Sequence, residues 1–165
     1  LWKEMGMADE ILSVGTVAPD FSLQASDGKT YSLKQFRNKQ RVVLYFYPRA
    51  DTPGCTTEAC GFRDRIADYH KQDVAVLGVS PDPVEDVTKF AEKYHLNFPL
   101  LADPDHAICE AYGVWQEKVR FGKTSMGVVR TTFIIGRDGK IEHVFRSVKP
   151  DGHEQQVLDK LAALA

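Results

Sequence analysis

An apolar run that leads straight into a helix start is the feature that most limits what this chain can fold into. The run covers residues 41–47 and is almost entirely apolar, which is typical of a strand buried on both faces of a sheet. Thr52 and Pro53 follow, a residue type that caps helices and one that suits the first helical position. The next apolar residues recur at helical spacing: Ala59, Phe62, Ile66 and Tyr69. The sequence therefore predicts a buried strand, a short loop and a helix in immediate succession.

The same alternation continues through the middle of the chain. Residues 74–79 form a second apolar run, and a helix start follows it, with Asp82 as the cap, Pro83 in the first turn and Glu85 completing a capping box. A short strand is predicted at 99–102, and a helix from Asp103 to about Gly113. Such alternation predicts an α/β fold with a partly parallel sheet covered on both faces.

Turn signals predict a hairpin near each end of the chain. Residues 21–33 read as two short strands around Asp27-Gly28, and residues 131–145 as two strands around Asp138-Gly139. A closing helix is predicted from the spacing of Val157, Leu158, Leu161 and Leu164. We therefore expect a central mixed sheet flanked by helices, with an N-terminal β-hairpin.

Length and composition indicate one domain. A chain of 165 residues with 43% hydrophobic residues can fill one core. We assign residues 14–165 to this domain and residues 1–13 to an N-terminal extension, in which the residues before Met7 can be an expression remnant, an upstream start or a processing product. A formal net charge of −2 gives no reason to expect nucleic acid or a membrane as a partner.

The cysteine content indicates a reducing compartment. Three cysteines suit a cytoplasmic protein, in which thiols are catalytic or buried. Residues 1–10 mix charged and apolar side chains and do not read as a secretory signal. We therefore expect a cytoplasmic location.

One cysteine falls where a helix favours negative charge. Cys55 is placed in the first helical turn, near unpaired backbone N–H groups and the positive end of the helix dipole. A thiol there ionises more readily and becomes a nucleophile. A second thiol, Cys60, lies five residues later, about 8.6 Å away between Cα atoms in an intact helix. A disulfide needs about 4.4–6.8 Å, so the two can bond only if the helix unwinds locally, which Gly61 would ease unless it merely allows close packing.

The spacing of Pro48, Thr52 and Cys55, Pro-x-x-x-Thr-x-x-Cys, resembles the active-site loop of the peroxiredoxins. With Cys60 present, the loop is similar to that of the bacterioferritin comigratory protein branch, the PrxQ type. Three later segments also resemble landmarks of that family: residues 98–103, 112–115 and 127–133. The likeness spans roughly residues 14–161 and implies a thioredoxin-like fold.

The resemblance also implies an activity, that of an atypical two-cysteine, thioredoxin-dependent peroxidase. Cys55 would attack hydrogen peroxide or an organic hydroperoxide, and Cys60 would resolve the resulting sulfenic acid as an intramolecular disulfide. Thr52, Pro48 and Arg130 would bind the peroxide and shield or stabilise the thiolate. Thioredoxin or a glutaredoxin-like protein would be the reductant, with no cofactor and no metal. Because resolution needs only one chain, a monomer is expected, with a dimer as the alternative.

The residues alone leave several roles open. Thr52 caps a helix whether or not it takes part in chemistry, and Glu58 is either a solvated helix residue or a group that orients the arginine. Arg49 competes with Arg130 for the role of the cation beside Cys55, because it lies in the loop itself. Cys109 is predicted to be a small buried hydrophobic residue.

Three other functions compete with the peroxidase. A dithiol oxidoreductase acting on protein disulfides normally has Cys-x-x-Cys, whereas four residues separate Cys55 and Cys60 here. A metal-binding module would use the three cysteines and five histidines, but no pair has the usual zinc spacing. A non-catalytic chaperone or scaffold on the same fold has no feature in its favour.

Overall fold

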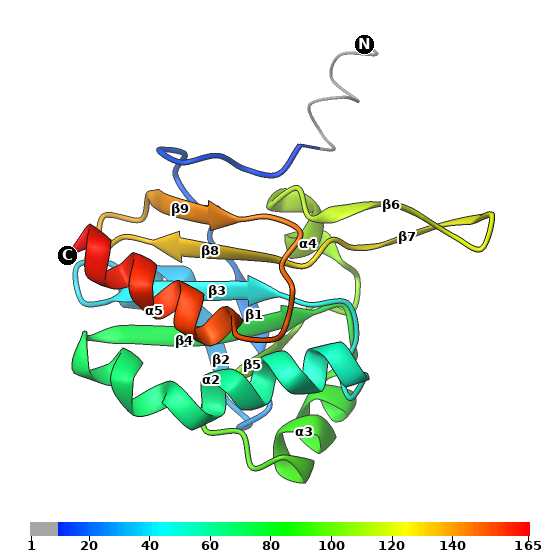
Figure 1. Ribbon diagram of the computed structural model, residues 1–165, viewed down its shortest axis with the longest axis horizontal. Coiled ribbons are helices and arrows are strands. Elements are labelled where there is room, and N and C mark those ends of the chain that lie inside the picture. Colours follow the sequence, from blue (N-terminus) through cyan, green and yellow to red (C-terminus); the bar gives the residue numbers. More distant parts are fainter. Residues whose placement is uncertain (1–9) are drawn as a thin grey trace.

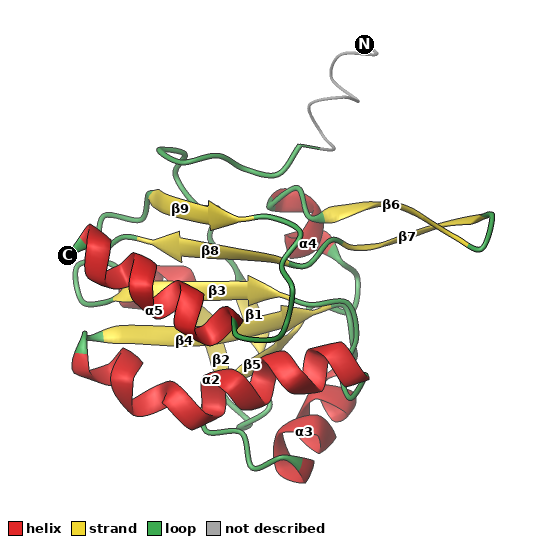
Figure 2. Ribbon diagram, viewed as in Figure 1, coloured by secondary structure: helices red, strands yellow, loops and turns green. Residues whose placement is uncertain are grey.

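In the computed structural model, which describes residues 10–165, helices cover both faces of a central sheet (Figure 1). The strands of this sheet are β3 (Arg41–Phe46), β4 (Val74–Ser80), β5 (Leu100–Ala102), β8 (Thr131–Ile135) and β9 (Ile141–Phe145). The helices are α2 (Pro53–Lys71), α3 (Val84–Lys93), α4 (Ala107–Ala111) and α5 (His153–Leu164), with a 3₁₀ helix η1 at Leu33–Phe36. Two hairpins lie outside the sheet: β1 (Ser22–Gln24) with β2 (Thr30–Ser32), and β6 (Trp115–Arg120) with β7 (Lys123–Val128) (Figure 2).

The central sheet is mixed, as predicted. Its strand order is β5-β4-β3-β8-β9, with β3, β4 and β5 parallel and with β8 antiparallel to both β3 and β9. The parallel pairs are connected by α2 and α3, whereas β8 and β9 form a hairpin. The N-terminal hairpin β1–β2 is also confirmed.

Side chains of β3 alternate between two cores, one on each face of the sheet. Val42, Leu44 and Phe46 pack on the face covered by α4, η1 and the β1–β2 hairpin. Val43, Tyr45 and Tyr47 pack on the opposite face, against α2, α3 and α5. This burial on both faces explains why the β3 sequence is an unbroken apolar run.

A close contact between β4 and β3 helps to set the height of α2 above the sheet. Gly78 lies opposite Tyr45 in the parallel pair, and a Cβ atom on Gly78 would lie 2.8 Å from the Tyr45 ring. The Tyr45 ring occupies this space and stacks on Phe62 of α2, with 4.7 Å between ring centroids. Phe62 is two turns beyond the start of α2, so the aromatic stack fixes the helix end that carries Cys55.

The β6–β7 hairpin was not predicted from the sequence. Its strands pair antiparallel from Trp115 opposite Val128 to Arg120 opposite Lys123, and they project from the body of the molecule (Figure 2). Phe121 and Gly122 form the turn, both with positive φ (53° and 75°). Two-residue turns of this kind favour Asn-Gly or Asp-Gly. Phe121 is not typical of the first turn position, so the sequence did not indicate a hairpin, although Gly122 is typical of the second.

Two helices begin later than predicted. Pro83, not Asp82, precedes α3 as its N-cap residue. The first helical residue of α4 is Ala107, four positions after Asp103. The Asp103 carboxylate nevertheless accepts hydrogen bonds from the N–H groups of Ile108 and Cys109, at 3.2 and 2.8 Å, so it caps the helix from outside it.

Residues 10–13 contact the domain. Ile11 and Leu12 pack against the core on the α4 face, and the Leu12 N–H donates to the Tyr112 carbonyl at 3.2 Å. Residues 1–9 lie outside the described part of the chain, so the division at residue 14 stays a prediction. Within residues 10–165, no helix is both long and apolar enough to cross a membrane.

Candidate active site

Cys55 lies in the first turn of α2, as predicted, and its side chain faces the sheet. The residue is 1% exposed and belongs to the same core cluster as Ala59 and Phe62. Pro53 occupies the first helical position, and Thr52 precedes it with extended backbone angles. Cys55 therefore combines a buried side chain with the electropositive end of a 19-residue helix.

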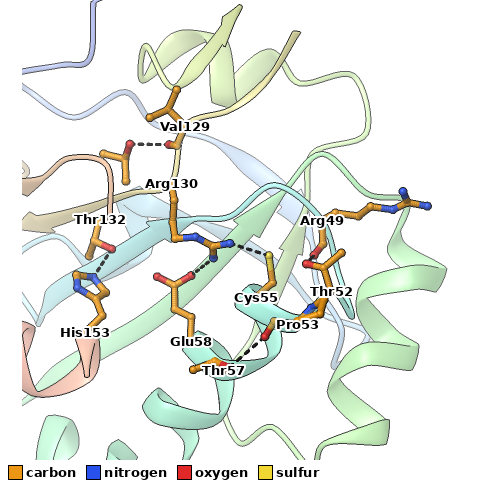
Figure 3. Close-up of polar contacts among 11 residues, drawn as sticks. Arg49, Thr52, Pro53, Cys55, Thr57, Glu58, Val129, Arg130, Thr132 and His153 are labelled. Carbon is orange, nitrogen blue, oxygen red and sulfur yellow. Dashed lines mark hydrogen bonds and ion pairs between the residues drawn. The ribbon is translucent and has the colours of Figure 1, made fainter. Parts of the chain in front are cut away.

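Arg130 is the cation beside Cys55. Its Nη2 atom donates to Cys55 Sγ at 3.3 Å, while Nη1 donates to Glu58 Oε1 at 2.6 Å (Figure 3). Arg130 lies between β7 and β8, and β8 pairs with β3, the strand that leads into the Cys55 loop. Residues 75 positions apart in the chain thus meet because the sheet places β8 beside β3. The contact places a permanent positive charge beside the sulfur atom.

Gly54 makes room for this guanidinium. A Cβ atom at position 54 would lie 3.2 Å from Arg130 Nη2 and 3.4 Å from the Pro150 side chain. The glycine therefore allows the planar guanidinium to lie against the first turn of α2.

Glu58 is buried rather than solvated, so the first of its two interpretations is wrong. Its side chain has no exposed surface, and it pairs with Arg130, whose side chain is 15% exposed. Burial raises the pKa of Glu58 to about 7, although Arg130 acts to lower it. Glu58 Oε2 is buried and has no hydrogen-bond partner within residues 10–165. The carboxyl group holds one edge of the guanidinium, so that the other edge faces sulfur.

The loop before α2 differs in detail from the prediction. Thr52 does not cap the helix with its side chain, because its hydroxyl donates to the Arg49 carbonyl at 3.0 Å. The Arg49 side chain is exposed and points away from Cys55, so its proximity in sequence does not make it the partner of the Cys55 sulfur (Figure 3). Pro48 is partly exposed and lines a cleft that opens beside the first turn of α2.

Asp82 anchors this loop, a contact that sequence reasoning missed. Its Oδ2 atom accepts from the Ala50 N–H and from the Ser80 hydroxyl, both at 2.7 Å, and the residue is 9% exposed. Asp82 follows the end of β4, which is parallel to β3, so the ends of the two strands meet at one edge of the sheet. Asp82 directly follows a buried strand, and this position could have indicated a role at the edge of the sheet. The proline after it made Asp82 resemble a helix cap instead.

The other two cysteines have different surroundings. Cys60 is partly exposed on α2, outside the buried stripe, and all three thiols are free. Cys109 is completely buried on the opposite face of the sheet, where burial and the nearby Asp103 raise its pKa well above that of an ordinary thiol. The prediction that Cys109 is a packing residue is therefore consistent with its place in the core.

A cleft of about 970 Å³ opens beside the first turn of α2. The loop and helix start form one wall, with Pro48, Arg49, Thr52, Pro53 and Gly54. The β6–β7 hairpin forms the other, with Trp115, Lys118, Val119, Arg120, Ser125, Met126, Gly127 and Val128, and Arg130 lies in its lining. All four ionisable side chains of the lining are cationic: Arg49, Lys118, Arg120 and Arg130.

The described residues offer no metal centre. Within residues 10–165, no group of three or more histidine, cysteine, aspartate or glutamate side chains could hold a metal ion. The site as built is instead a buried thiol, a paired guanidinium and a cationic cleft, which together suit the binding and reduction of a small polar oxidant.

Comparison with known proteins connects this geometry to a family. The AhpC/TSA family model matches residues 14–144. Peroxiredoxin Bcp of Escherichia coli strain K12 is 51% identical over 150 residues, which cover 91% of this chain and 96% of the relative. Peroxiredoxin Bcp of Bacillus subtilis strain 168 is 43% identical over 150 residues, 91% of this chain and 95% of the relative.

Solved structures of similar proteins share the fold. The bacterioferritin comigratory protein of Xanthomonas campestris, solved in trapped intermediate and ligand complexes that concern alkyl peroxide reduction, superposes with a TM-score of 0.85. It is 35% identical, and the match covers 93% of this chain and 98% of that one. A cysteine-to-serine mutant of PrxQ from Xylella fastidiosa gives 0.88 at 34% identity, over 94% of this chain and 98% of the other.

Proposed function

This chain belongs to the AhpC/TSA family as a peroxiredoxin of the Bcp or PrxQ type, a thiol peroxidase of thioredoxin-like fold, and we propose on that premise that Cys55 and Cys60 carry its chemistry. Cys55 is the thiolate that reacts with hydrogen peroxide or an organic hydroperoxide. Cys60 then resolves the oxidised sulfur within the same chain. The observation that carries the assignment is the 3.3 Å contact between Arg130 and the buried Cys55 sulfur.

The first step oxidises sulfur and cleaves the peroxide. The Cys55 thiolate attacks the hydroxyl oxygen of the hydroperoxide, so that an S–O bond forms and the O–O bond breaks. The bonding pair leaves with the second oxygen as an alkoxide, or as hydroxide from hydrogen peroxide, and sulfur becomes a sulfenic acid. Negative charge therefore moves from sulfur onto the leaving oxygen, and preorganised donors around that path lower the barrier.

Arg130 and the first turn of α2 supply those donors. The guanidinium already lies against sulfur, and the unpaired N–H groups at the start of α2 add positive potential. Thr52, whose hydroxyl bonds the Arg49 carbonyl in this structure, lines the cleft and turns toward the peroxide when one binds. Pro48 closes the wall of the cleft and limits the access of water. Glu58 is a positioning residue that holds Arg130 in place.

Resolution requires α2 to unwind between the two thiols. In an intact helix their Cα atoms are about 8.6 Å apart, beyond the reach of a disulfide. Unwinding one or two turns brings the Cys60 thiol to the sulfenic sulfur, an S–S bond forms, and the sulfenic oxygen leaves as water. The partial exposure of Cys60 suits it to this movement.

A dithiol protein then reduces the disulfide. Thioredoxin or a glutaredoxin-like protein fits this role, because thiol–disulfide exchange needs an exposed sulfur to attack and Cys60 is the more exposed of the pair. Since both thiols lie on one helix, one chain completes the cycle, and we expect the monomer to be active.

Peroxide consumption with a thioredoxin system tests these assignments. Cys55→Ser should abolish activity with every donor, because no other thiol lies beside Arg130. Cys60→Ser should react once with peroxide and leave a sulfenic acid that dimedone traps. Cys109→Ser is the matched control and should keep turnover near the wild-type rate, although it removes a buried thiol.

Peptide mapping of the oxidised protein completes the test. It should yield a peptide that links Cys55 to Cys60, and the protein should run as a monomer on a non-reducing gel. A link to Cys109, or between two chains, would contradict the assignment of Cys60. Substantial peroxidase activity in Cys55→Ser would contradict the assignment of the nucleophile.

A further inference from the structure

Lys118 is an unpaired cation on the hairpin wall of the active-site cleft. It is partly buried, and within residues 10–165 its side chain has no hydrogen bond or ion pair. The other lysine near the hairpin turn, Lys123, is exposed and does not line the cleft. A lysine half-removed from water without an anionic partner is costly to maintain, so its place in the cleft calls for a functional explanation.

The side chain of Lys118 leans toward the reaction centre. Its backbone pairs with Ser125, but its stem lies over Gly127, two residues nearer to the base of the hairpin. A Cβ atom on Gly127 would lie 3.4 Å from Lys118 Cδ and 3.8 Å from Nζ. The side chain therefore runs toward the base of the hairpin and away from its tip, and Arg130 follows that base three residues after Gly127.

The electrostatic environment of Lys118 couples it to the site. Burial, together with Arg130 and Arg120, lowers the pKa of Lys118, while Cys55 acts in the opposite direction. The charges that act on the ammonium therefore come from three parts of the chain: Arg120 on β6 itself, Arg130 before β8 and Cys55 on α2. A lysine whose pKa is lowered gives up its proton more readily than an ordinary one.

The leaving oxygen needs a proton donor that the other ionisable groups of the cleft cannot provide. The remaining ionisable residues of its lining are all arginines, which do not release a proton in proteins. Glu58 has no exposed surface and lies on the far side of Arg130. Lys118 is the one ionisable group of the described lining that can donate a proton and recover it from water.

We propose that Lys118 is the general acid of the peroxidase reaction. As Cys55 Sγ bonds to the hydroxyl oxygen and the O–O bond breaks, the Lys118 ammonium transfers one proton to the departing alkoxide, which leaves as a neutral alcohol. The neutral amine then takes a proton from water, so no further oxidant or reductant is needed. This inference rests on the proposal that Cys55 is the peroxide-reacting thiolate.

Two substitutions separate proton donation from charge. Lys118→Met removes both, whereas Lys118→Arg keeps the charge but cannot donate. Each variant is mixed in single turnover with tert-butyl hydroperoxide, whose leaving alkoxide is strongly basic, and with a neutral peracid, whose leaving carboxylate needs no proton. Lys123→Met is the matched control for loss of a hairpin cation, and Cys55→Ser tests the premise.

Both Lys118 variants should lose about 100-fold in the rate constant for tert-butyl hydroperoxide, the scale of general acid catalysis. They should lose no more than about threefold for the peracid, while Lys123→Met reacts like the wild type. Wild-type rates in Lys118→Arg, or equal losses with both oxidants in Lys118→Met, would overturn the proposal. Peroxide reaction in Cys55→Ser would instead overturn the premise, so the two failures can be told apart.

Discussion

Cys55 and Cys60 lie on one helix, but their surroundings differ: Cys55 is buried beside Arg130, whereas Cys60 is partly exposed. The turn that carries Cys55 is fixed from three sides, by Arg130, by the sheet beneath it and by the loop that Asp82 anchors. Cys60 lies on the part of the helix that turns away from the sheet, and it is partly exposed. Gly61 follows it, and the nearest neighbour there is the flexible Glu154 side chain of α5.

In the mechanism that we propose, this difference matches the two steps of the reaction. Oxidation benefits from groups that do not move, because the donors must already point at the charge that develops. Resolution by Cys60, as we propose it, requires movement, because an intact helix keeps the two thiols too far apart to bond. In the proposed cycle, one helix therefore carries a buried thiol held beside Arg130 and a partly exposed thiol that moves to meet it.

The largest expected effect comes from removing what fixes the Cys55 turn. Arg130→Ala should slow the single-turnover oxidation of Cys55 by about 100-fold, comparable to the loss of one oxyanion-hole donor in other enzymes. The Glu58 carboxyl, left without its cation, should become protonated, so the fold is retained. Resolution by Cys60 should keep its rate, because Cys60 has no contact with Arg130. Stopped-flow fluorescence, with Trp115 in the cleft as the probe, resolves both steps.

Arg49→Ala is the matched control for Arg130→Ala. It removes an arginine that also lines the cleft but points away from sulfur, so we expect at most about a threefold change in the oxidation rate. If instead Arg49→Ala slows oxidation more than Arg130→Ala does, the contact between Arg130 and Cys55 is not the one that supports the reaction.

The position of Cys55 could be predicted from the sequence better than the positions of Arg130 and Glu58, which contact it or hold its partner. The strand, the loop and the helix start at Pro53 are local signals, so the place of Cys55 in the first turn could be predicted from a few neighbouring residues. Arg130 was predicted only through family resemblance, because nothing local indicates that β8 pairs with β3. Glu58 was left open for the same reason, since its burial depends on the arginine that arrives from 72 residues away.

The β6–β7 hairpin and Asp82 show where local signals mislead. Phe121 occupies a turn position with positive φ that normally favours Asn, Asp or Gly, so the hairpin was missed and with it one wall of the cleft. Asp82 precedes a proline and a helix, the usual pattern for a cap, but the end of β3 lies close enough for its carboxylate to bind the Ala50 N–H instead. Only the Asp82 case depends on a tertiary contact, because Phe121 is 96% exposed at the tip of a local hairpin.

A smaller effect should follow from stiffening the helix next to Cys60. Replacing Gly61 with Ala favours the helix by about 1 kcal/mol, so disulfide formation, which requires unwinding, should slow by about fivefold. The first reaction with peroxide should be unchanged. Because a Cβ atom at position 61 would crowd the Glu154 carboxylate, the comparison is made in a Glu154→Ala background, with Glu154→Ala alone as the control.

Amide exchange provides an independent measurement of the same movement. In the disulfide form, amides of residues 55–65 should exchange faster than in the reduced form. Equal protection in both redox states would mean that the helix does not open to form the disulfide, and the proposed unwinding of α2 would be wrong.

The smallest effect concerns the pH dependence of stability at the fixed turn. Burial raises the pKa of Glu58 to about 7 from a usual value of 4.5, so the folded chain binds this proton more tightly than the unfolded chain does. The contribution of Glu58 to the free energy of unfolding is therefore greatest below pH 4.5 and is lost as the pH rises through about 7. Glu58→Gln has no proton to lose, and it should therefore gain stability relative to the wild type across this range.

Urea unfolding at pH 5, 6, 7 and 8 measures the difference between the two proteins, with Glu117→Gln, an exposed carboxyl on β6, as the control. The difference between Glu58→Gln and wild type should grow with pH, by no more than about 1.4 kcal/mol per pH unit, and level off above pH 7, whereas Glu117→Gln should track the wild type. A difference that shrinks with rising pH would show that the ion pair with Arg130 outweighs the cost of burying the carboxylate. The Cys55 turn would then be held by charge attraction, whereas the growth expected here means that Glu58 serves to aim the guanidinium at a net cost to stability.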